Sequence, residues 1–170
     1  MKRLLILRHA KSSWDDADLS DFDRPLNARG LKTAPFMGRL MAERGLLPAA
    51  IVSSPANRAK QTATLVKDNF GSDIPISFDE RIYEASPGTL RIVVADTSDD
   101  LASIMVVGHN PGIEGFIRHL TGEIESMPTA ALAVIDLNID SWSEISPGTG
   151  SLITVIRPKE EIPSAGGASA

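Results

Sequence analysis

The sequence predicts an α/β protein with a mostly parallel central sheet, and three observations carry this prediction. Short apolar segments alternate with amphipathic segments of helical period from the N-terminus to about residue 120, which is typical of βαβ units. Two further apolar segments, 131–137 and 151–156, read as adjacent strands and predict an antiparallel pair. With 170 residues, 42% of them hydrophobic, the chain has the length and apolar content of one domain with a sizeable core.

The composition narrows the classes of function. The formal net charge of −5 argues against a general nucleic-acid-binding surface and makes any cluster of arginines more informative. The sequence has no cysteine, which excludes disulfides, thiolate metal sites and cysteine-nucleophile phosphatase chemistry. No stretch approaches the roughly 20 apolar residues of a membrane span, and the apolar run after Lys2-Arg3 is too short for a signal peptide. We therefore expect a cytoplasmic protein that binds neither nucleic acid nor membranes.

The first predicted strand ends in two residues that can carry chemistry. Residues 4–7 are four consecutive apolar residues and predict a buried strand, which Arg8 and His9 follow at once. The next segment, 15–25, is acidic and turn-rich and predicts a surface loop. An Asp-x-Asp pair in this loop resembles the paired aspartates of metal-dependent phosphatases. The buried strand that such a pair must follow is missing, so this interpretation is rejected.

The middle of the chain predicts two helices and a strand. A helix is expected over 27–44, with Asn27 as its N-cap and with Pro35 either kinking it or beginning its main part. The apolar segment 49–52 predicts a second strand. A helix with Ser54 as N-cap and Pro55 at its first position is expected to follow that strand and to run to about residue 69.

The second half of the chain continues the alternation. Residues 74–78 predict a third strand, near a sheet edge because of its proline. Residues 103–107 predict the clearest buried strand. Helices are expected over 90–97 and 113–120. From residue 158 the chain is rich in Gly, Ala, Ser and Pro, which predicts a disordered tail after a single domain over 1–157.

Chemically active side chains follow four of the predicted strands, namely His9, Arg58, Glu84 and His109. Because ligands bind beyond the carboxyl ends of parallel strands, we expect these side chains to meet at one edge of the sheet. The two arginines, Arg8 and Arg58, and the two histidines would form a pocket for a dianion such as phosphate. A neutral imidazole is a competent nucleophile toward phosphorus, and nearby arginines keep it unprotonated. The sequence therefore predicts a phosphoryl-transfer site that needs no metal and no cofactor.

Competing motifs fail on particular residues. The segment 108–112, Gly-His-Asn-Pro-Gly, has the outline of the nucleophile elbow of serine hydrolases, but Asn110 occupies the place of the serine. The sequence has no phosphate-binding P-loop and no dinucleotide-binding glycine motif. His9 and His109 lack a carboxylate at metal-ligand spacing, which argues against a zinc site. His119 lies inside a predicted helix and is expected to be structural.

Several motifs together resemble the histidine phosphatase superfamily, the phosphoglycerate mutase-like proteins, and most of all its small SixA-type phosphohistidine phosphatases. Each motif is weak alone, but the set is specific and covers residues 1 to about 157. The matching segments are Arg8-His9-Ala10-Lys11-Ser12-Ser13-Trp14, Asp23-Arg24-Pro25-Leu26-Asn27, Ser53-Ser54-Pro55-Ala56-Asn57-Arg58-Ala59, Tyr83-Glu84-Ala85-Ser86, Gly108-His109-Asn110 and Pro128-Thr129-Ala130-Ala131.

The resemblance implies a three-layer α/β/α sandwich and a set of roles. His9 would become transiently phosphorylated, Arg8, Arg58 and His109 would hold the phosphoryl group, and water would then release phosphate. Family members that act on phosphate esters also use a carboxylic acid to protonate the leaving group. Glu84 is the candidate for that acid by its position.

Two further residues and two departures from the family pattern complete the expectation. Ser12 and Asn110 are candidates for substrate binding. Ala10 stands where many relatives have glycine. Asp15 stands where mutase-type members usually have asparagine, which argues against a mutase.

The predicted function is a metal-independent phosphatase that works through a phosphohistidine intermediate. The short segment between Glu84 and His109 leaves little room for a lid over the pocket, and an open site suits phosphohistidine carried by a protein. The alternatives are a phosphatase for a small phosphate ester, such as a sugar phosphate, and a non-catalytic phosphate- or phosphoprotein-binding domain. The expected partners are therefore a phosphorylated protein or a small phosphate ester. The oligomeric state is open, with a monomer as the preferred alternative.

Overall fold

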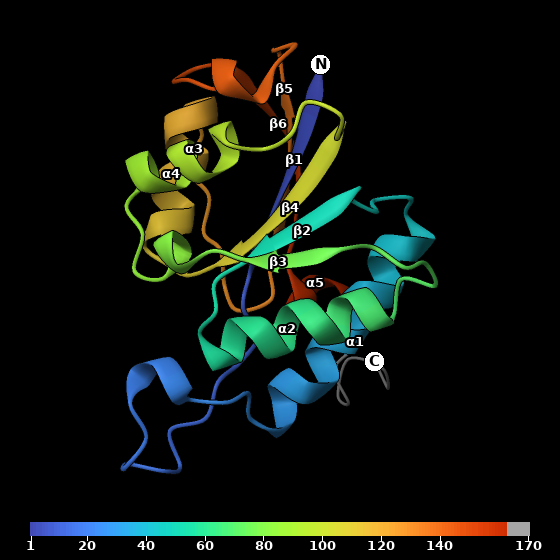
Figure 1. Ribbon diagram of the computed structural model, residues 1–170. Coiled ribbons are helices and arrows are strands. Elements are labelled where there is room, and N and C mark those ends of the chain that lie inside the picture. Colours follow the sequence, from blue (N-terminus) through green and yellow to red (C-terminus); the bar gives the residue numbers. More distant parts are fainter. Residues whose placement is uncertain (163–170) are drawn as a thin grey trace.

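A computed structural model describes residues 1–162, in which six strands form one mixed sheet (Figure 1). The order of strands across the sheet is β3-β2-β4-β1-β5-β6. The strands are β1 (Lys2–Arg8), β2 (Ala50–Ser53), β3 (Ile76–Phe78), β4 (Ser103–Gly108), β5 (Leu132–Leu137) and β6 (Gly150–Ile156). The α-helices are α1 (Ala28–Glu43), α2 (Asn57–Asp68), α3 (Pro87–Ala95), α4 (Gly112–Thr121) and α5 (Pro158–Glu161). Three short 3₁₀ helices are η1 (Asp21–Asp23), η2 (Glu80–Ile82) and η3 (Trp142–Glu144).

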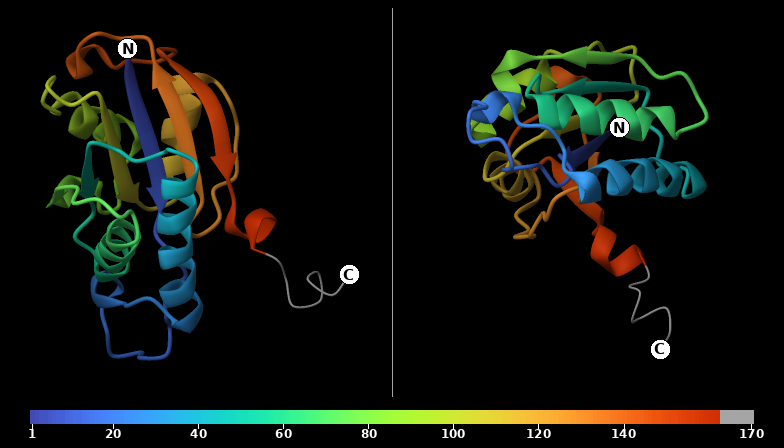
Figure 2. Two further views of the ribbon diagram at one scale, coloured as in Figure 1. Left: turned by 90° about the vertical axis from the view of Figure 1, so that its right-hand side faces the viewer. Right: turned by 90° about the horizontal axis from the view of Figure 1, so that it is seen from below.

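The strand directions confirm the predicted fold class. The strand β4 pairs in parallel with both β1 and β2, and β2 pairs in parallel with β3 at the sheet edge. The strand β5 runs antiparallel to β1 and to β6, so the two C-terminal strands form the predicted antiparallel pair. Figure 2 (left) shows β1, β5 and β6 side by side along the sheet.

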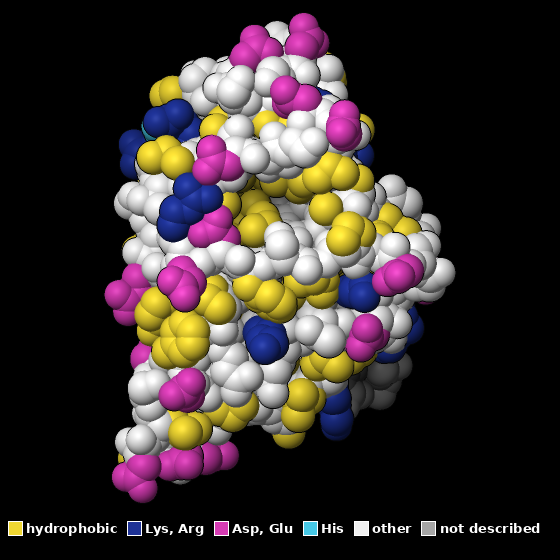
Figure 3. Space-filling view, in the orientation of Figure 1, with side chains coloured by type: hydrophobic (Ala, Val, Ile, Leu, Met, Phe, Trp, Pro, Cys, Tyr) yellow, Lys and Arg dark blue, Asp and Glu magenta, His cyan; other side chains and the backbone are white. Residues whose placement is uncertain are grey.

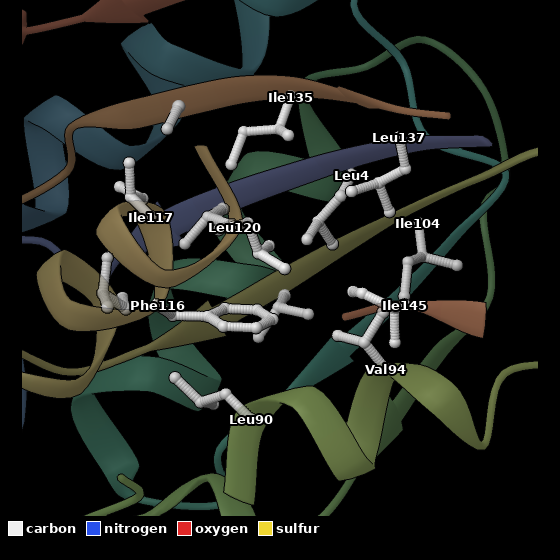
Figure 4. Close-up of a cluster of buried hydrophobic side chains, with 14 of the residues drawn as sticks. Leu4, Leu90, Val94, Ile104, Phe116, Ile117, Leu120, Ile135, Leu137 and Ile145 are labelled. Atoms are coloured by element: carbon white, nitrogen blue, oxygen red, sulfur yellow. The ribbon is translucent and has the colours of Figure 1, made fainter. Parts of the chain in front are cut away.

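Helices cover both faces of the sheet, which gives three layers. Successive residues of a strand point to opposite faces, and β1 accordingly has apolar residues on both. Leu4 and Ile6 join the cluster that α3 and α4 cover, where Phe116 is fully buried (Figure 4). Leu5 and Leu7 join the cluster on the other face, under α1 and α2. Burial on both faces explains why this strand reads as a continuous apolar run.

The helix α1 begins as the sequence predicts. The Asn27 side chain accepts a hydrogen bond from the backbone N–H of Gly30 at 2.9 Å, which is the N-cap contact. A Cβ atom at position 30 would lie 2.2 Å from the carbonyl oxygen of Lys11, so only glycine permits this close approach. The start of α1 therefore packs directly against the segment that follows β1.

The helix α2 begins later than the sequence predicts, because Ser54 is not its N-cap. The backbone N–H of Ser54 donates to the carbonyl oxygen of Val107 and so still pairs with β4. The helix starts at Asn57, with Ala56 in the N-cap position. Ser54 is instead available to contact a histidine, as described below.

Two other boundaries differ from expectation. The helix α3 begins at Pro87 rather than at residue 90, because the Ser86 hydroxyl caps it by accepting from the N–H of Thr89. Residues 158–161, expected to belong to a disordered tail, form α5, and Glu161 pairs with Arg44 at 2.6 Å. The tail prediction for residues 163–170 lies outside the described residues.

Within residues 1–162, no helix has the length and apolar character needed to cross a membrane.

Candidate active site

The carboxyl ends of β1 and β4 and the start of α2 surround a cavity of about 260 Å³. In Figure 1 this is the lower end of the sheet, where the loop before η1 also lies. The cavity brings together most of the residues that the sequence singled out as candidates. It is lined by Arg8, His9, Lys11, Ser12, Trp14, Arg24, Arg58, His109, Asn110 and Thr129.

His9 is held in one tautomer by the backbone. Its Nδ1 lies 2.8 Å from the carbonyl oxygen of Ala10, and a carbonyl can only accept, so Nδ1 carries the proton. The lone pair of the neutral ring is therefore on Nε2. The backbone is itself fixed, because the N–H of Ala10 donates to the Thr62 hydroxyl and this hydroxyl donates to the carbonyl oxygen of Arg58.

The environment of His9 disfavours a charged ring. The residue is only 6% exposed, and its pKa is lowered to about 3, with burial as the largest cause. Within this net effect the hydrogen bond to Ala10 raises the pKa, while His109, Arg58 and Arg8 contribute to lowering it. At neutral pH the ring is therefore uncharged and its Nε2 is free to act as a nucleophile.

The two arginines face the cavity from different elements. Arg8, the last residue of β1, donates from Nη1 to the carbonyl oxygen of Met127 at 3.1 Å, and burial lowers its pKa. Its Nε is buried without a partner among the described residues. Arg58 lies in the first turn of α2, where the positive end of a helix favours an anion. In this structure the carboxylate of Asp21 contacts the Arg58 guanidinium.

His109 follows β4 and lies beside His9, with 5.2 Å between the ring centroids. Its Nε2 is 2.8 Å from the hydroxyl of Ser54, which explains the role of that serine. Burial lowers the pKa of His109 to about 4, Arg58 and Arg8 lower it as well, and Asp21 opposes them. Two neutral imidazoles thus share one cavity with three guanidinium groups, those of Arg8, Arg24 and Arg58.

Asp21 is a site residue that sequence reasoning missed. Arg58 donates from Nη1 to its carbonyl oxygen at 2.6 Å and from Nη2 to its carboxylate at 3.0 Å. Arg24 and the hydroxyl of Tyr83 also donate to this carboxylate, at 2.8 and 2.6 Å. The bond from Tyr83 is the largest of the effects that lower the pKa of Asp21 to about 2. The Asp-x-Asp pattern, rejected as a metal site, was the one sequence signal for this residue.

Ser12 and Asn110 both line the cavity, as the resemblance implied. The Ser12 hydroxyl accepts from the guanidinium of Arg24. The amide nitrogen of Asn110 donates to Glu114 and to the carbonyl oxygen of Met127, both at 2.9 Å, and its Oδ1 is buried without a partner among the described residues. Asn110 is thus oriented by contacts beneath the cavity.

Glu84 is the one candidate that the structure does not bring to the cavity. Its strand, β3, is the edge strand and is separated from β1 by β2 and β4. The residue is exposed, has a positive φ of 54° and is not part of the cavity lining. Its neighbour Tyr83 instead packs edge-on against His109, with 5.5 Å between the ring centroids. Glu84 as general acid remains a prediction.

The charge of the lining determines what the cavity can hold. The lining contains four Lys or Arg residues and no carboxylate, which suits an anion such as phosphate. Among residues 1–162, no group of three or more His, Asp or Glu side chains is placed to hold a metal ion.

The sequence model of the histidine phosphatase superfamily (branch 1) matches residues 4–92, about half of the chain and the part that carries Arg8, His9 and Arg58. The chain belongs to the histidine phosphatase superfamily. It is 34% identical over 160 residues to an uncharacterized protein of Mycobacterium tuberculosis, an alignment that covers 86% of this chain and 96% of the relative.

Solved structures of other superfamily members have the same fold. The Agrobacterium tumefaciens protein assigned as the phosphohistidine phosphatase SixA is 32% identical and superimposes with a TM-score of 0.80, covering 92% of this chain and 98% of that chain. The protein histidine phosphatase SixA complexed with tungstate gives a TM-score of 0.81 at 23% identity, covering 94% and 99%. At 23% identity, the comparison with this second structure shows the fold alone. This chain has the phosphoglycerate mutase-like architecture that the resemblance implied.

Proposed function

We propose that this histidine phosphatase superfamily member is a phosphatase that accepts a phosphoryl group on His9 and passes it to water. The observation that carries the proposal is the state of the His9 ring, with Nδ1–H committed to the Ala10 carbonyl and the Nε2 lone pair unprotonated. The guanidinium groups of Arg8 and Arg58 would neutralise the charge on the phosphoryl oxygens during transfer. His109, at 5.2 Å from the His9 ring, would contact the same group.

The reaction consists of two displacements at phosphorus. In the first, a bond forms between His9 Nε2 and phosphorus as the bond to the leaving group breaks. The Nδ1–H of His9 stays on the ring, and its bond to Ala10 stabilises the positive charge that the ring acquires. In the second, water attacks phosphorus, the bond to Nε2 breaks, and inorganic phosphate leaves with the neutral His9 restored.

We further propose that the substrate is phosphohistidine in a protein. An alkoxide leaving group needs a general acid, and none of the cavity-lining residues is a carboxylic acid. Asp21, a carboxylate that contacts the lining residues Arg58 and Arg24, has its pKa lowered to about 2 and is ionised at neutral pH. The imidazole of a phosphohistidine leaves readily once solvent has protonated it, so it requires no acid from the enzyme. The Agrobacterium relative assigned as a phosphohistidine phosphatase supports the same substrate class.

The test is a substrate panel offered to the pure protein without added metal: a phosphohistidine protein, a sugar phosphate and an aryl phosphate. We expect release of phosphate from the phosphohistidine protein with the highest kcat/KM. Preference for the sugar phosphate would replace the proposal with an ester phosphatase. Binding of phosphoprotein with no turnover of any substrate would indicate a binding domain.

A further inference from the structure

Trp14 is a solvent-exposed aromatic residue at the edge of the cavity. Its residue surface is 75% exposed, against 38% for Phe22 and 44% for Phe78, the other exposed aromatic residues in residues 1–162. A tryptophan buries about 150–250 Å² of surface when it packs into a core. The exposed Trp14 therefore contributes little hydrophobic free energy to the stability of the fold. Trp14 nevertheless lines the cavity that holds His9 and Arg58.

One face of the Trp14 ring is occupied. The guanidinium carbon of Arg24 lies 3.2 Å from the ring centroid, which is a cation–π stack. Arg24 is itself buried and fixed, because it donates to the carbonyl oxygen of Ser13 at 3.0 Å, to Asp21 and to the Ser12 hydroxyl. The indole ring of Trp14 is therefore packed against a guanidinium group that is itself held in place by hydrogen bonds.

The other face of the Trp14 ring has no aromatic or cationic partner among the described residues. The aromatic ring pairs within residues 1–162 involve His9, His109, Tyr83 and Phe22 and do not include Trp14. Trp14 is also the one apolar side chain among the ten described residues that line the cavity. The arginines and histidines can hold the phosphoryl group, but Trp14 alone offers the organic part of a substrate an apolar surface. Flat rings prefer such surfaces, where an offset-stacked pair gains free energy beyond the area it buries.

We propose that the free face of Trp14 is a stacking platform for the planar ring of the leaving group, which is the imidazole of phosphohistidine. The proposal rests on the proposed phosphatase function and names the part of the substrate that Trp14 recognises. Trp14 is then a specificity-determining residue: it distinguishes a phosphoryl group carried by a ring from one carried by a small group without a ring. Stacking that forms with the bound substrate would raise kcat/KM for ring-bearing substrates selectively.

The experiment compares Trp14→Leu and Trp14→Phe with wild type. The substrates are free phosphohistidine, phosphoramidate, which has a P–N bond and no ring, and 4-nitrophenyl phosphate, which has a ring and a P–O bond. We expect Trp14→Leu to lower the ratio of kcat/KM for phosphohistidine to that for phosphoramidate by about 2- to 10-fold, the size of one aromatic stacking contact. Trp14→Phe keeps a ring and should retain most of the ratio.

Phe78→Leu is the matched control, because Phe78 is an exposed aromatic residue with a cation above its ring, Lys60 at 5.5 Å, and does not line the cavity. It should leave the ratio unchanged. An equal loss on all three substrates in Trp14→Leu would overturn the proposal, since Trp14 would then act only by supporting Arg24. An unchanged ratio would overturn it as well.

The two ring-bearing substrates separate this inference from the proposed function. If wild type hydrolyses neither free phosphohistidine nor the phosphohistidine protein of the substrate panel, the proposed substrate is wrong. A selective loss of 4-nitrophenyl phosphate hydrolysis in Trp14→Leu would still support a ring platform in that case, whereas no selective loss would overturn both.

Discussion

The two sides of the cavity are built in different ways. One side comes from the ends of β1 and β4 and the first turn of α2, and its side chains Arg8, His9, Arg58 and His109 are buried or half-buried. The other side comes from residues 12–24, a segment with exposed acidic side chains at positions 15, 16 and 18. In Figure 3 acidic side chains cover the lower tip of the molecule, where this segment lies in Figure 1.

This difference separates two tasks. The strand-end side positions its groups through the sheet and through backbone hydrogen bonds, such as the one that fixes the His9 tautomer. The loop side acts through its side chains: Asp21 pairs with Arg58, and Trp14 stacks on Arg24. We therefore expect substitutions on the strand-end side to affect the phosphoryl-transfer step, and substitutions on the loop side to affect affinity and substrate choice.

His9→Ala should have the largest effect, because it removes the nucleophile. We expect a loss of kcat of about 10⁴-fold or more with the fold retained, since the deleted ring borders an existing cavity and not the packed core. Rapid acid quench after mixing with labelled substrate should trap protein-bound phosphate on wild type and not on the variant. Undiminished hydrolysis by the variant would contradict the proposed mechanism.

Arg58→Ala should rank second. Loss of one preorganised donor to the transferring group costs about 3 kcal/mol of transition-state stabilisation, or roughly 10²-fold in kcat. Arg58→Lys should recover only part of this loss, because lysine keeps the charge but not the paired donors. Steady-state kinetics on the preferred substrate measures both variants. Full activity of the lysine variant would contradict direct contact of Arg58 with the phosphoryl group.

The two buried histidines should make the stability of the strand-end side depend on pH. Their pKa values in the folded protein are lowered to about 3 for His9 and about 4 for His109, below the usual 6.5. Between pH 6.5 and these values the unfolded chain binds more protons than the folded one, so the free energy of unfolding falls as pH falls. Each histidine contributes a slope of up to about 1.4 kcal/mol per pH unit.

Urea unfolding of wild type and His9→Gln at several pH values from 7 to 4 measures this effect. The variant should lose stability less steeply than wild type on acidification, because one of the two titrating rings is gone. His119→Gln is the comparison, since His119 lies in α4 away from the cavity lining. Parallel curves for wild type and His9→Gln would show that His9 is not held neutral by burial.

On the loop side, Asp21→Asn should change affinity for the product more than turnover. The Asp21 carboxylate neutralises Arg58 and Arg24, so its removal leaves more positive charge for an anion. We expect inorganic phosphate to inhibit the variant about 2- to 5-fold more tightly, a factor typical of one partly exposed ion pair. Asp16→Asn, in the same loop but without an ion pair to either arginine, is the control.

Tyr83 provides a second readout of the same substitution, because it is the one tyrosine in the sequence. Burial and then its hydrogen bond to Asp21 raise the pKa of Tyr83 to about 12. In Asp21→Asn the ultraviolet titration of the phenol should shift to lower pH. An unshifted titration, or unchanged phosphate inhibition, would mean that Asp21 does not control the charge of the cavity.

The same contrast explains how much the sequence could predict. The carboxyl ends of neighbouring parallel strands must share an edge, so apolar runs followed by Arg8-His9 and by His109 were enough to predict the strand-end side. The contact between Asp21 and Arg58 joins residues 37 positions apart and depends on how an irregular loop folds back. Such a segment has no hydrophobic period that could reveal which side chain returns to the site.

Ser54 and Glu84 show where the strand-end rule itself fails. A serine followed by proline resembles a helix N-cap, but the hydroxyl of Ser54 instead contacts His109, the residue that follows the neighbouring strand β4. Strand order across the sheet was not readable from the sequence either. Because β3 lies at the edge, a residue that follows it is farther from β1 than one that follows β4.

Glu84→Gln should have the smallest effect of the set, and it tests whether the segment that follows β3 contributes an acid. Glu84 is exposed and outside the cavity lining, so we expect kcat/KM for phosphohistidine to change less than about 2-fold. The diagnostic comparison uses leaving groups of different basicity, since a positioned general acid contributes about 10²- to 10⁴-fold when the leaving oxygen is a basic alkoxide. If Glu84 moves in to protonate the leaving group, the variant loses most activity on alkyl phosphates, less on an aryl phosphate and least on phosphohistidine. A small loss that is the same for all three would instead mean that Glu84 acts on binding through its charge alone, and protonation would then fall to water or to His109.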